Sequence, residues 1–114
     1  MKTLRPAIVL CFLCAGSTAA AHHSFAPHFD PDSSVTITGT ITGFERRNPH
    51  SYLRIEVRGE TGEIKEYECE SSGITQLRRN GIDADILKTG STVTVTGQQH
   101  RRDPHKCFFR TVQV

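Results

Sequence analysis

The chain has little of what would mark a membrane protein, a nucleic-acid binder or an enzyme. Its longest apolar run, Ala7–Ala15, is shorter than the ~20 residues that a membrane-spanning helix needs. Basic and acidic side chains nearly balance, at 14 and 12, whereas nucleic-acid binding depends on excess positive charge. The sequence shows no recognisable catalytic motif: no nucleophile with a neighbouring base, no catalytic pair of carboxylates and no glycine-rich phosphate loop. We therefore expect a binding protein that is not an enzyme and does not bind nucleic acid.

The apolar run belongs instead to a predicted secretory signal peptide over residues 1–21. Two basic residues precede the run and small residues follow it, which is the order that export signals show. The cut can follow Ala20 or Ala21, because both choices place small residues at the required positions. Only the second makes His22 the first residue. We expect a periplasmic protein with no membrane span after the signal is removed.

The remaining chain predicts a small domain made mainly of β-strands. Residues 22–34 are polar and lack periodicity, so we expect an N-terminal arm there and the folded domain over residues 35–114. From Val35 onward, β-branched residues alternate with threonines, which is typical of a half-buried strand. Gly39 and Gly43 lie inside this pattern and indicate bends, as a closed barrel requires.

Four more strands follow with one short helix among them. Residues 52–58 and 63–70 predict a hairpin, residues 73–79 predict a helix capped by Ser72, and two strands follow near 92–96 and 107–114. In the last strand, simple alternation places Phe108 on the same face as Val112 and Val114. Three strands, a helix and two strands is the order of an OB-type five-stranded barrel, with one short helix between strands three and four. An open antiparallel sheet with one helix is the alternative.

Cys69 and Cys107 are the cysteines outside the predicted signal peptide. In an oxidising compartment their structural interpretation is a disulfide, and their functional interpretation is a pair of metal ligands or a redox couple. In an OB barrel the third and fifth strands are neighbours, so the two cysteines would come close. This arrangement favours the disulfide.

Histidine is abundant, and two of the six histidines stand at the predicted cleavage site. If His22 is the first residue, its amine and its imidazole can chelate one ion, and His50 or His28 can supply a second imidazole. If Ala21 is first, the amine, two amides and the His23 ring form a square-planar set. Tetragonal nitrogen ligation favours Cu(II), so both cuts predict a copper site.

A second interpretation assigns the barrel face to an anionic ligand or a periplasmic protein partner. Arg46 and Arg47 precede the Asn48-Pro49 turn, and Tyr52 follows it on the next strand. OB barrels bind ligands across this kind of face. The acidic run Glu63, Glu66, Glu68 and Glu70 is most simply a solvated strand face.

Several motifs together resemble a family of small exported bacterial proteins known as a domain of unknown function. They are His22-His23-Ser24-Phe25, the Thr/Gly-rich segment that leads into Asn48-Pro49-His50, and Leu87-Lys88-Thr89-Gly90 before the fourth strand. The resemblance implies a periplasmic, single-domain, OB-like protein whose role is uncharacterised. Members carry a tryptophan near the Asn-Pro-His turn, whereas this chain has none. A ligand surface built on that tryptophan would therefore differ here.

Overall fold

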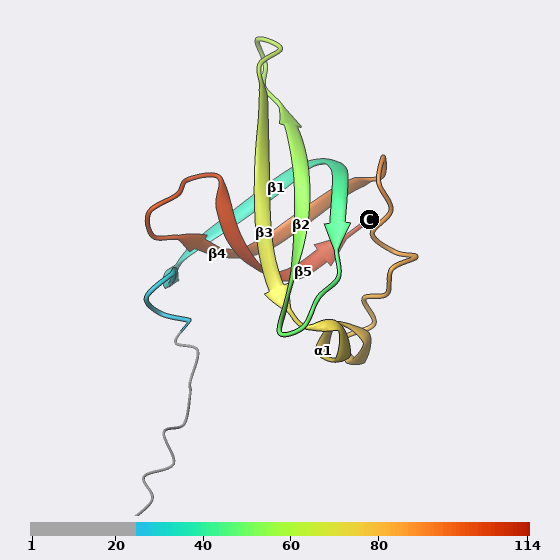
Figure 1. Cartoon of the computed structure of the whole chain (residues 1–114). Coiled ribbons are helices and arrows are strands. Elements are labelled where there is room, and N and C mark those ends of the chain that lie inside the picture. Colours follow the sequence, from blue (N-terminus) through green and yellow to red (C-terminus); the bar gives the residue numbers. More distant parts are fainter. Residues whose placement is uncertain (1–24) are drawn as a thin grey trace, which may run out of the picture.

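The computed structural model describes residues 25–114, which form one closed five-stranded barrel (Figure 1). The elements, in chain order, are β1 (Phe29–Glu45), β2 (His50–Arg58), β3 (Ile64–Ser72), α1 (Ile74–Arg79), β4 (Thr92–His100) and β5 (Lys106–Gln113). The strands close in the order β1-β2-β3-β5-β4, with β3 and β5 parallel. This confirms the predicted OB-type barrel and excludes the open sheet. The predicted signal peptide, His22 and His23 lie outside the described residues.

The first strand begins at Phe29, so the predicted start at Val35 is wrong. Between Phe29 and Ser34 the pairing with β4 is irregular, and no alternation of buried and exposed residues marks this part of the strand. These polar residues are part of the strand because β1 pairs here with β4, which is distant in the sequence. The local alternation of residue types cannot indicate such a pairing. β4 is likewise longer than predicted, because it extends to His100.

Glycines allow β1 to bend and to pair with two strands. β1 pairs with β4 up to Thr40 and with β2 from Thr40 onward. At Gly39 an added Cβ would lie 2.3 Å from the carbonyl oxygen of Glu56, so only glycine permits this approach. The register with β2 shifts between Ile41 and Gly43. The predicted bends are therefore present.

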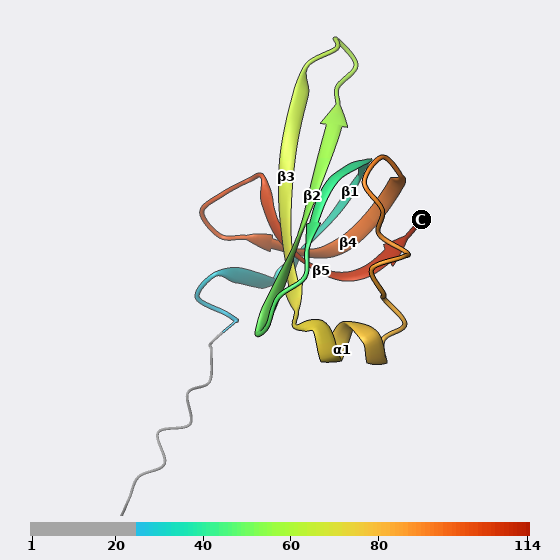
Figure 2. The same ribbon diagram turned by 45° about the vertical axis from the view of Figure 1, so that its right-hand side comes forward.

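The core lies inside the barrel and is closed at one end by α1. It contains the inward-facing residues of all five strands together with Leu77 of α1 and Leu87 (Ile37, Ile41, Leu53, Ile55, Cys69, Leu77, Leu87, Val93, Val95, Cys107 and Phe109). Figure 2 shows α1 across the lower end of the barrel. The predicted disulfide is confirmed: Cys69 and Cys107 are register partners on β3 and β5, their Cα atoms are 4.5 Å apart, and both are buried.

In the last strand, the phenylalanine that faces the core is not the predicted one. Phe109 belongs to the core, whereas Phe108 lies outside it, among the aromatic rings on the outer face of the barrel. A register shift opposite Gly97 adds a residue to β5, so that strict alternation fails between Phe109 and Val112. A Cβ atom added at Gly97 would lie 1.9 Å from the Phe108 carbonyl oxygen, so a larger residue does not fit there.

The start of the helix is capped from a distant loop and not by Ser72. Gly73 is the N-cap residue and has no side-chain cap of its own. The Oδ1 atom of Asn48 accepts a hydrogen bond of 2.9 Å from the Ile74 amide instead. The Asn48–Pro49 peptide bond is cis, and the predicted turn stands at the start of β2. The turn therefore joins the β1–β2 connection to α1.

Candidate functional site

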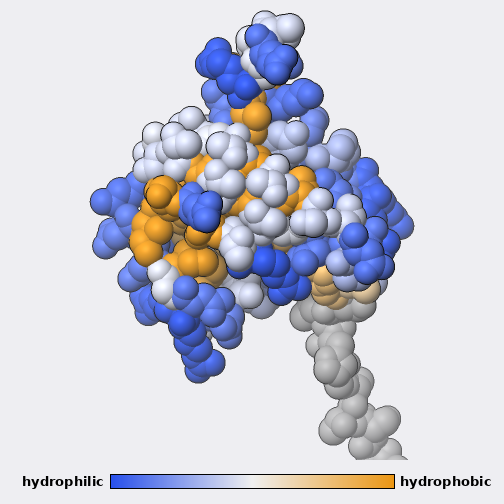
Figure 3. All heavy atoms as spheres, turned by 180° about the vertical axis from the view of Figure 1, so that it is seen from behind, coloured by the Kyte–Doolittle hydropathy of each residue, from blue (hydrophilic) through white to orange (hydrophobic). Residues whose placement is uncertain are grey.

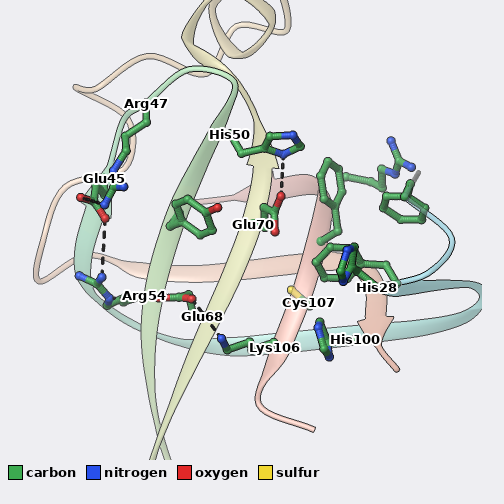
Figure 4. A pocket seen from close by; sticks show the side chains of 15 residues that line it. His28, Glu45, Arg47, His50, Arg54, Glu68, Glu70, His100, Lys106 and Cys107 are labelled. Atoms are coloured by element: carbon green, nitrogen blue, oxygen red, sulfur yellow. Dashed lines mark hydrogen bonds and ion pairs between the residues drawn. The ribbon is translucent and has the colours of Figure 1, made fainter. Parts of the chain in front are cut away.

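A groove of about 780 Å³ crosses the outer face of β2, β3 and β5 (Figure 4). The β1–β2 connection borders it on one side, and the turn before β1 together with the end of β4 borders it on the other. Its lining residues are Phe25, His28, Phe29, Glu45, Arg47, His50, Tyr52, Arg54, Glu68, Glu70, His100, Lys106, Cys107, Phe108 and Arg110. In OB folds this face, between the loops that follow β1 and β4, is where ligands bind.

Charged side chains of alternating sign cross the groove. Arg54 lies 3.7 Å from Glu45 and 3.5 Å from Glu68, and Lys106 lies 3.7 Å from Glu68. Arg47 also pairs with Glu45. The pairs arise because Arg54 and Lys106 are direct register partners of Glu68 on the two neighbouring strands. The carboxylates therefore balance most of the positive charge in the groove.

The acidic run on β3 is not simply a solvated strand face. The side chains of Glu68 and Glu70 are 32% and 24% exposed, and each contacts a basic or imidazole group. Their alternate positions direct both into the groove, whereas the sequence shows only a blurred alternation. The sequence pattern alone does not identify Glu70 as a site residue. Its partner, His50, lies twenty positions away in the chain and on another strand.

Tyr52 lies in the middle of the groove, between β1 and β3. Its register partners are Glu45 and Glu70, and the Arg47 guanidinium lies 5.8 Å from its ring centre. Burial raises the pKa of the Tyr52 phenol, and the negative charge of Glu70 raises it further, whereas Arg47 lowers it. The Tyr52 hydroxyl is thus a neutral hydrogen-bonding group in this groove.

The carboxylate of Glu70 fixes the orientation of the His50 ring. Its Nδ1 atom is buried and lies 2.6 Å from Oε1 of Glu70, while 32% of the side chain stays exposed (Figure 4). On its other side, the imidazole lies 6.5 Å, centre to centre, from the Phe108 ring. The turn at Pro49 therefore presents an imidazole of fixed orientation. Asn48 of the same turn caps α1.

Aromatic rings fill the end of the groove beside His50. The Phe25 ring stacks on Phe29 at 5.3 Å and meets Phe108 edge-on at 5.0 Å. The guanidinium of Arg110 lies about equally far from the Phe25 and Phe108 rings, at 5.0 and 4.9 Å. Phe25 and His50 thus lie against the same ring, Phe108.

Backbone hydrogen bonds hold the turn that carries Phe25. The Phe25 carbonyl accepts hydrogen bonds from the amides of His28 and Phe29. Arg101, in the β4–β5 loop, donates from Nε to the Ala26 carbonyl at 2.6 Å and from its amide to the His28 carbonyl at 2.8 Å. The position where residues 22–24 join the domain is therefore fixed at this end of the groove.

His28 lies beside His100 and is not grouped with His50. The two rings are 6.4 Å apart. The Nδ1 atom of His100 accepts hydrogen bonds from the amides of Arg102 and Asp103, at 3.1 and 3.0 Å, so His100 shapes the β4–β5 loop. Within residues 25–114, no three His, Cys, Asp or Glu side chains are arranged to hold a metal ion.

The predicted arginine surface is divided. Arg47 and Tyr52 line the groove, whereas Arg46 lies 3.5 Å from Asp83, in the segment after α1. The arginines of α1 and of the β4–β5 loop do not line the groove. No helix among residues 25–114 has the length and apolar character to cross a membrane.

Solved structures with this architecture are similar to the chain in fold. The mitochondrial single-stranded DNA binding protein Rim1 from S. cerevisiae aligns with a TM-score of 0.54 at 14% identity, covering 71% of this chain and 91% of Rim1. The N-terminal domain of PriB from Thermoanaerobacter tencongensis aligns at 0.52 and 18% identity, covering 72% and 94%. A chain from the structure of yeast Stn1 and Ten1 aligns with a TM-score of 0.51 at 18% identity, covering 71% of this chain and 42% of the matched chain.

These likenesses show the OB fold and, at such identities, nothing beyond the fold. No curated protein is detectably similar to the chain in sequence. A family profile, in contrast, matches residues 10–107, which is most of the chain. The chain therefore belongs to the family of unknown function DUF6152.

Proposed function

We propose that this chain is an exported, periplasmic binding protein that holds Cu(II) at the aromatic end of the groove. The ligands are the terminal amine and imidazole of His22 and the imidazole of His50, with His28 nearby in reserve. If the cut leaves Ala21 first, the amine, two deprotonated backbone amides and the His23 ring form a square-planar set instead. The observation that carries the proposal is that Phe25 and His50 both pack against Phe108.

The short distance along the chain makes this set possible. Two residues separate His22 from Phe25, and an extended chain covers ~3.5 Å per residue, so His22 can reach about 10 Å from Phe25. The ring centres of Phe25 and His50 lie 5.0 and 6.5 Å from that of Phe108, so an ion bound between these two rings is within reach of both His22 and His50. A leading segment that emerged on the opposite face of the barrel could not share a metal with His50.

The surroundings of His50 resemble those of known metal-binding histidines. Such histidines usually direct their second ring nitrogen to a carboxylate, which fixes the ring and raises its basicity. Glu70 holds this position at Nδ1 of His50, so Nε2 is the nitrogen assigned to the metal. An amine and two imidazoles supply three nitrogen ligands, a set that favours Cu(II).

The disulfide supports export, because such bonds persist in oxidising compartments. Nucleic acid is not the proposed ligand, although Rim1 is a single-stranded DNA binding protein. Single-stranded nucleic acid needs a positive groove with exposed stacking rings. Here Glu45, Glu68 and Glu70 line the groove and pair with its basic or imidazole groups. We propose a binding role without turnover.

Calorimetric titration of the exported protein with Cu(II) tests the proposal, after intact-mass measurement has fixed its first residue. A form whose N-terminal amine is acetylated should bind at least about tenfold more weakly, since the chelating amine is lost. His50→Gln and Glu70→Gln should each weaken binding by ~10–100-fold. His105→Gln, which changes a histidine outside the groove, is the matched control and should bind normally. Equal affinity of the acetylated and authentic forms would refute the model.

A further inference from the structure

The outer half of β3 has a strand neighbour on one side only. β3 pairs with β2 from Ile64 to Ser72 but with β5 only from Glu68 to Glu70. Figures 1 and 2 show the β2–β3 hairpin rising beyond the barrel, with no strand beside its β3 edge. Among the described residues, the edge from Ile64 to Tyr67 is therefore an open sheet edge.

The backbone groups on this edge point outward. The Glu68 amide donates to the His105 carbonyl at 2.9 Å, so Glu68 directs its backbone toward β5. Because alternate residues of a strand direct their amide and carbonyl groups to the same side, Glu66 and Ile64 direct theirs to the same edge. Beyond His105 no strand of the described chain receives them. An edge of this kind is a template for an added strand.

The side chains beside the edge select what can be added. Ile64 is 54% exposed, a large apolar side chain on the same face as Glu66 and Glu68. Next to Glu66 is a hollow of about 320 Å³ lined by Glu66, Glu68, Asp103, His105 and Lys106. Glu68 is paired with Arg54 and Lys106, whereas Glu66 and Asp103 form no ion pair within residues 25–114. The hollow therefore fits a cation.

We propose that this edge binds an extended segment of a partner protein as an additional strand. The segment carries a lysine or arginine that enters the hollow between Glu66 and Asp103. It also carries an apolar residue two positions away, on the same face, which covers Ile64. Main-chain hydrogen bonds to Ile64 and Glu66 supply the register, and the alternate side chains supply the selectivity, as in other strand-addition complexes.

A second copy of the chain does not fit this edge. Symmetric antiparallel pairing places one residue opposite itself on the two-fold axis. A dimer that uses the whole edge is centred on Lys65 or on Glu66, so it sets lysine against lysine or glutamate against glutamate. Like charges directly opposite each other destabilise a pair of strands. The charges on this edge therefore oppose self-association and leave it to a different, basic strand.

A defined peptide tests the inference without reference to copper. The probe is acetyl-Thr-Lys-Thr-Val-Thr-Lys-Thr-amide, which has a lysine two positions from valine in either direction. The control peptide has glutamates in place of the lysines. With isotope-labelled protein, the lysine peptide should slow hydrogen exchange at the Ile64 and Glu66 amides by at least about tenfold, since bonded amides exchange only when the contact opens. The control peptide should leave exchange unchanged.

Two protein variants separate the hollow from general electrostatics. Glu66→Lys should weaken binding of the lysine peptide by roughly fivefold, the size expected for an exposed charge pair that is reversed. Glu60→Lys makes the same charge change in the exposed hairpin turn and should bind like the unmodified chain. The inference is overturned if the Ile64 and Glu66 amides of the free protein already exchange as slowly as that of Glu68. Equal weakening by both variants, or no binding of the lysine peptide at millimolar concentration, would also overturn it.

Discussion

Removing the Cys69–Cys107 disulfide should cost this domain a large part of its stability. The bond joins β3 to the last strand across a sequence separation of 38 residues. The chain-entropy relation for a loop of that length gives about 4 kcal/mol of stabilisation at room temperature. A small domain has only ~5–15 kcal/mol of total stability. The double variant Cys69→Ala/Cys107→Ala should therefore fold, with a melting temperature lower by roughly 20 °C.

Urea unfolding followed by circular dichroism measures this loss. The slope of the unfolding free energy against urea should increase in the double variant, because its unfolded chain is no longer cross-linked and exposes more surface. Either single alanine variant should lose almost as much as the double variant, since each breaks the same bond. A double variant that loses less than about 1 kcal/mol, with an unchanged slope, would contradict the assignment of the stabilisation to the unfolded chain.

Three further predictions concern the strand register, the helix cap and the groove. Gly97→Ala should destabilise the domain by about 1–3 kcal/mol or more in urea unfolding, because its Cβ would lie 1.9 Å from the Phe108 carbonyl oxygen. Asn48→Ala should cost about 1 kcal/mol and increase hydrogen exchange at the Ile74 amide, which loses its acceptor. The raised pKa of Tyr52 stabilises the folded state below the ordinary phenol pKa of 10.0, and this contribution is lost as the pH rises through and above that value. Urea unfolding on the two sides of that pH should show a smaller decrease for Tyr52→Phe than for the unmodified chain.

The barrel was predictable because its signals are local. Threonine alternating with valine or isoleucine marks β1 and β4, and the loop from Gly59 to Gly62 marks the hairpin, where Gly62 has a φ of +86°. At the end of α1, Gly81 adopts a φ of +78°, the left-handed conformation in which glycine commonly ends a helix. Each of these signals depends only on neighbours within a few positions of the chain.

The features that local patterning missed all depend on contacts between distant segments. Asn48 caps a helix 26 positions away, and no local pattern distinguishes this role from that of an ordinary turn residue. The bulge opposite Gly97 exchanges the expected roles of Phe108 and Phe109, because alternation is lost where one strand contains an extra residue. Glu70 appeared as one acid among several until pairing of β2 with β3 brought it to His50.

The position of β5 in the ring sets the order in which this molecule can be assembled. β5 is the fifth strand in the chain, yet it stands between β3 and β4. In a nascent chain that has emerged only as far as β4, one edge of β3 and one edge of β4 therefore lack the partner strand that β5 will later supply. Neither the groove nor the cross-link exists until Lys106–Gln113 has emerged. Ribosome-arrested fragments that end before Lys106 should consequently remain accessible to chaperones and proteases, however complete their first four strands are.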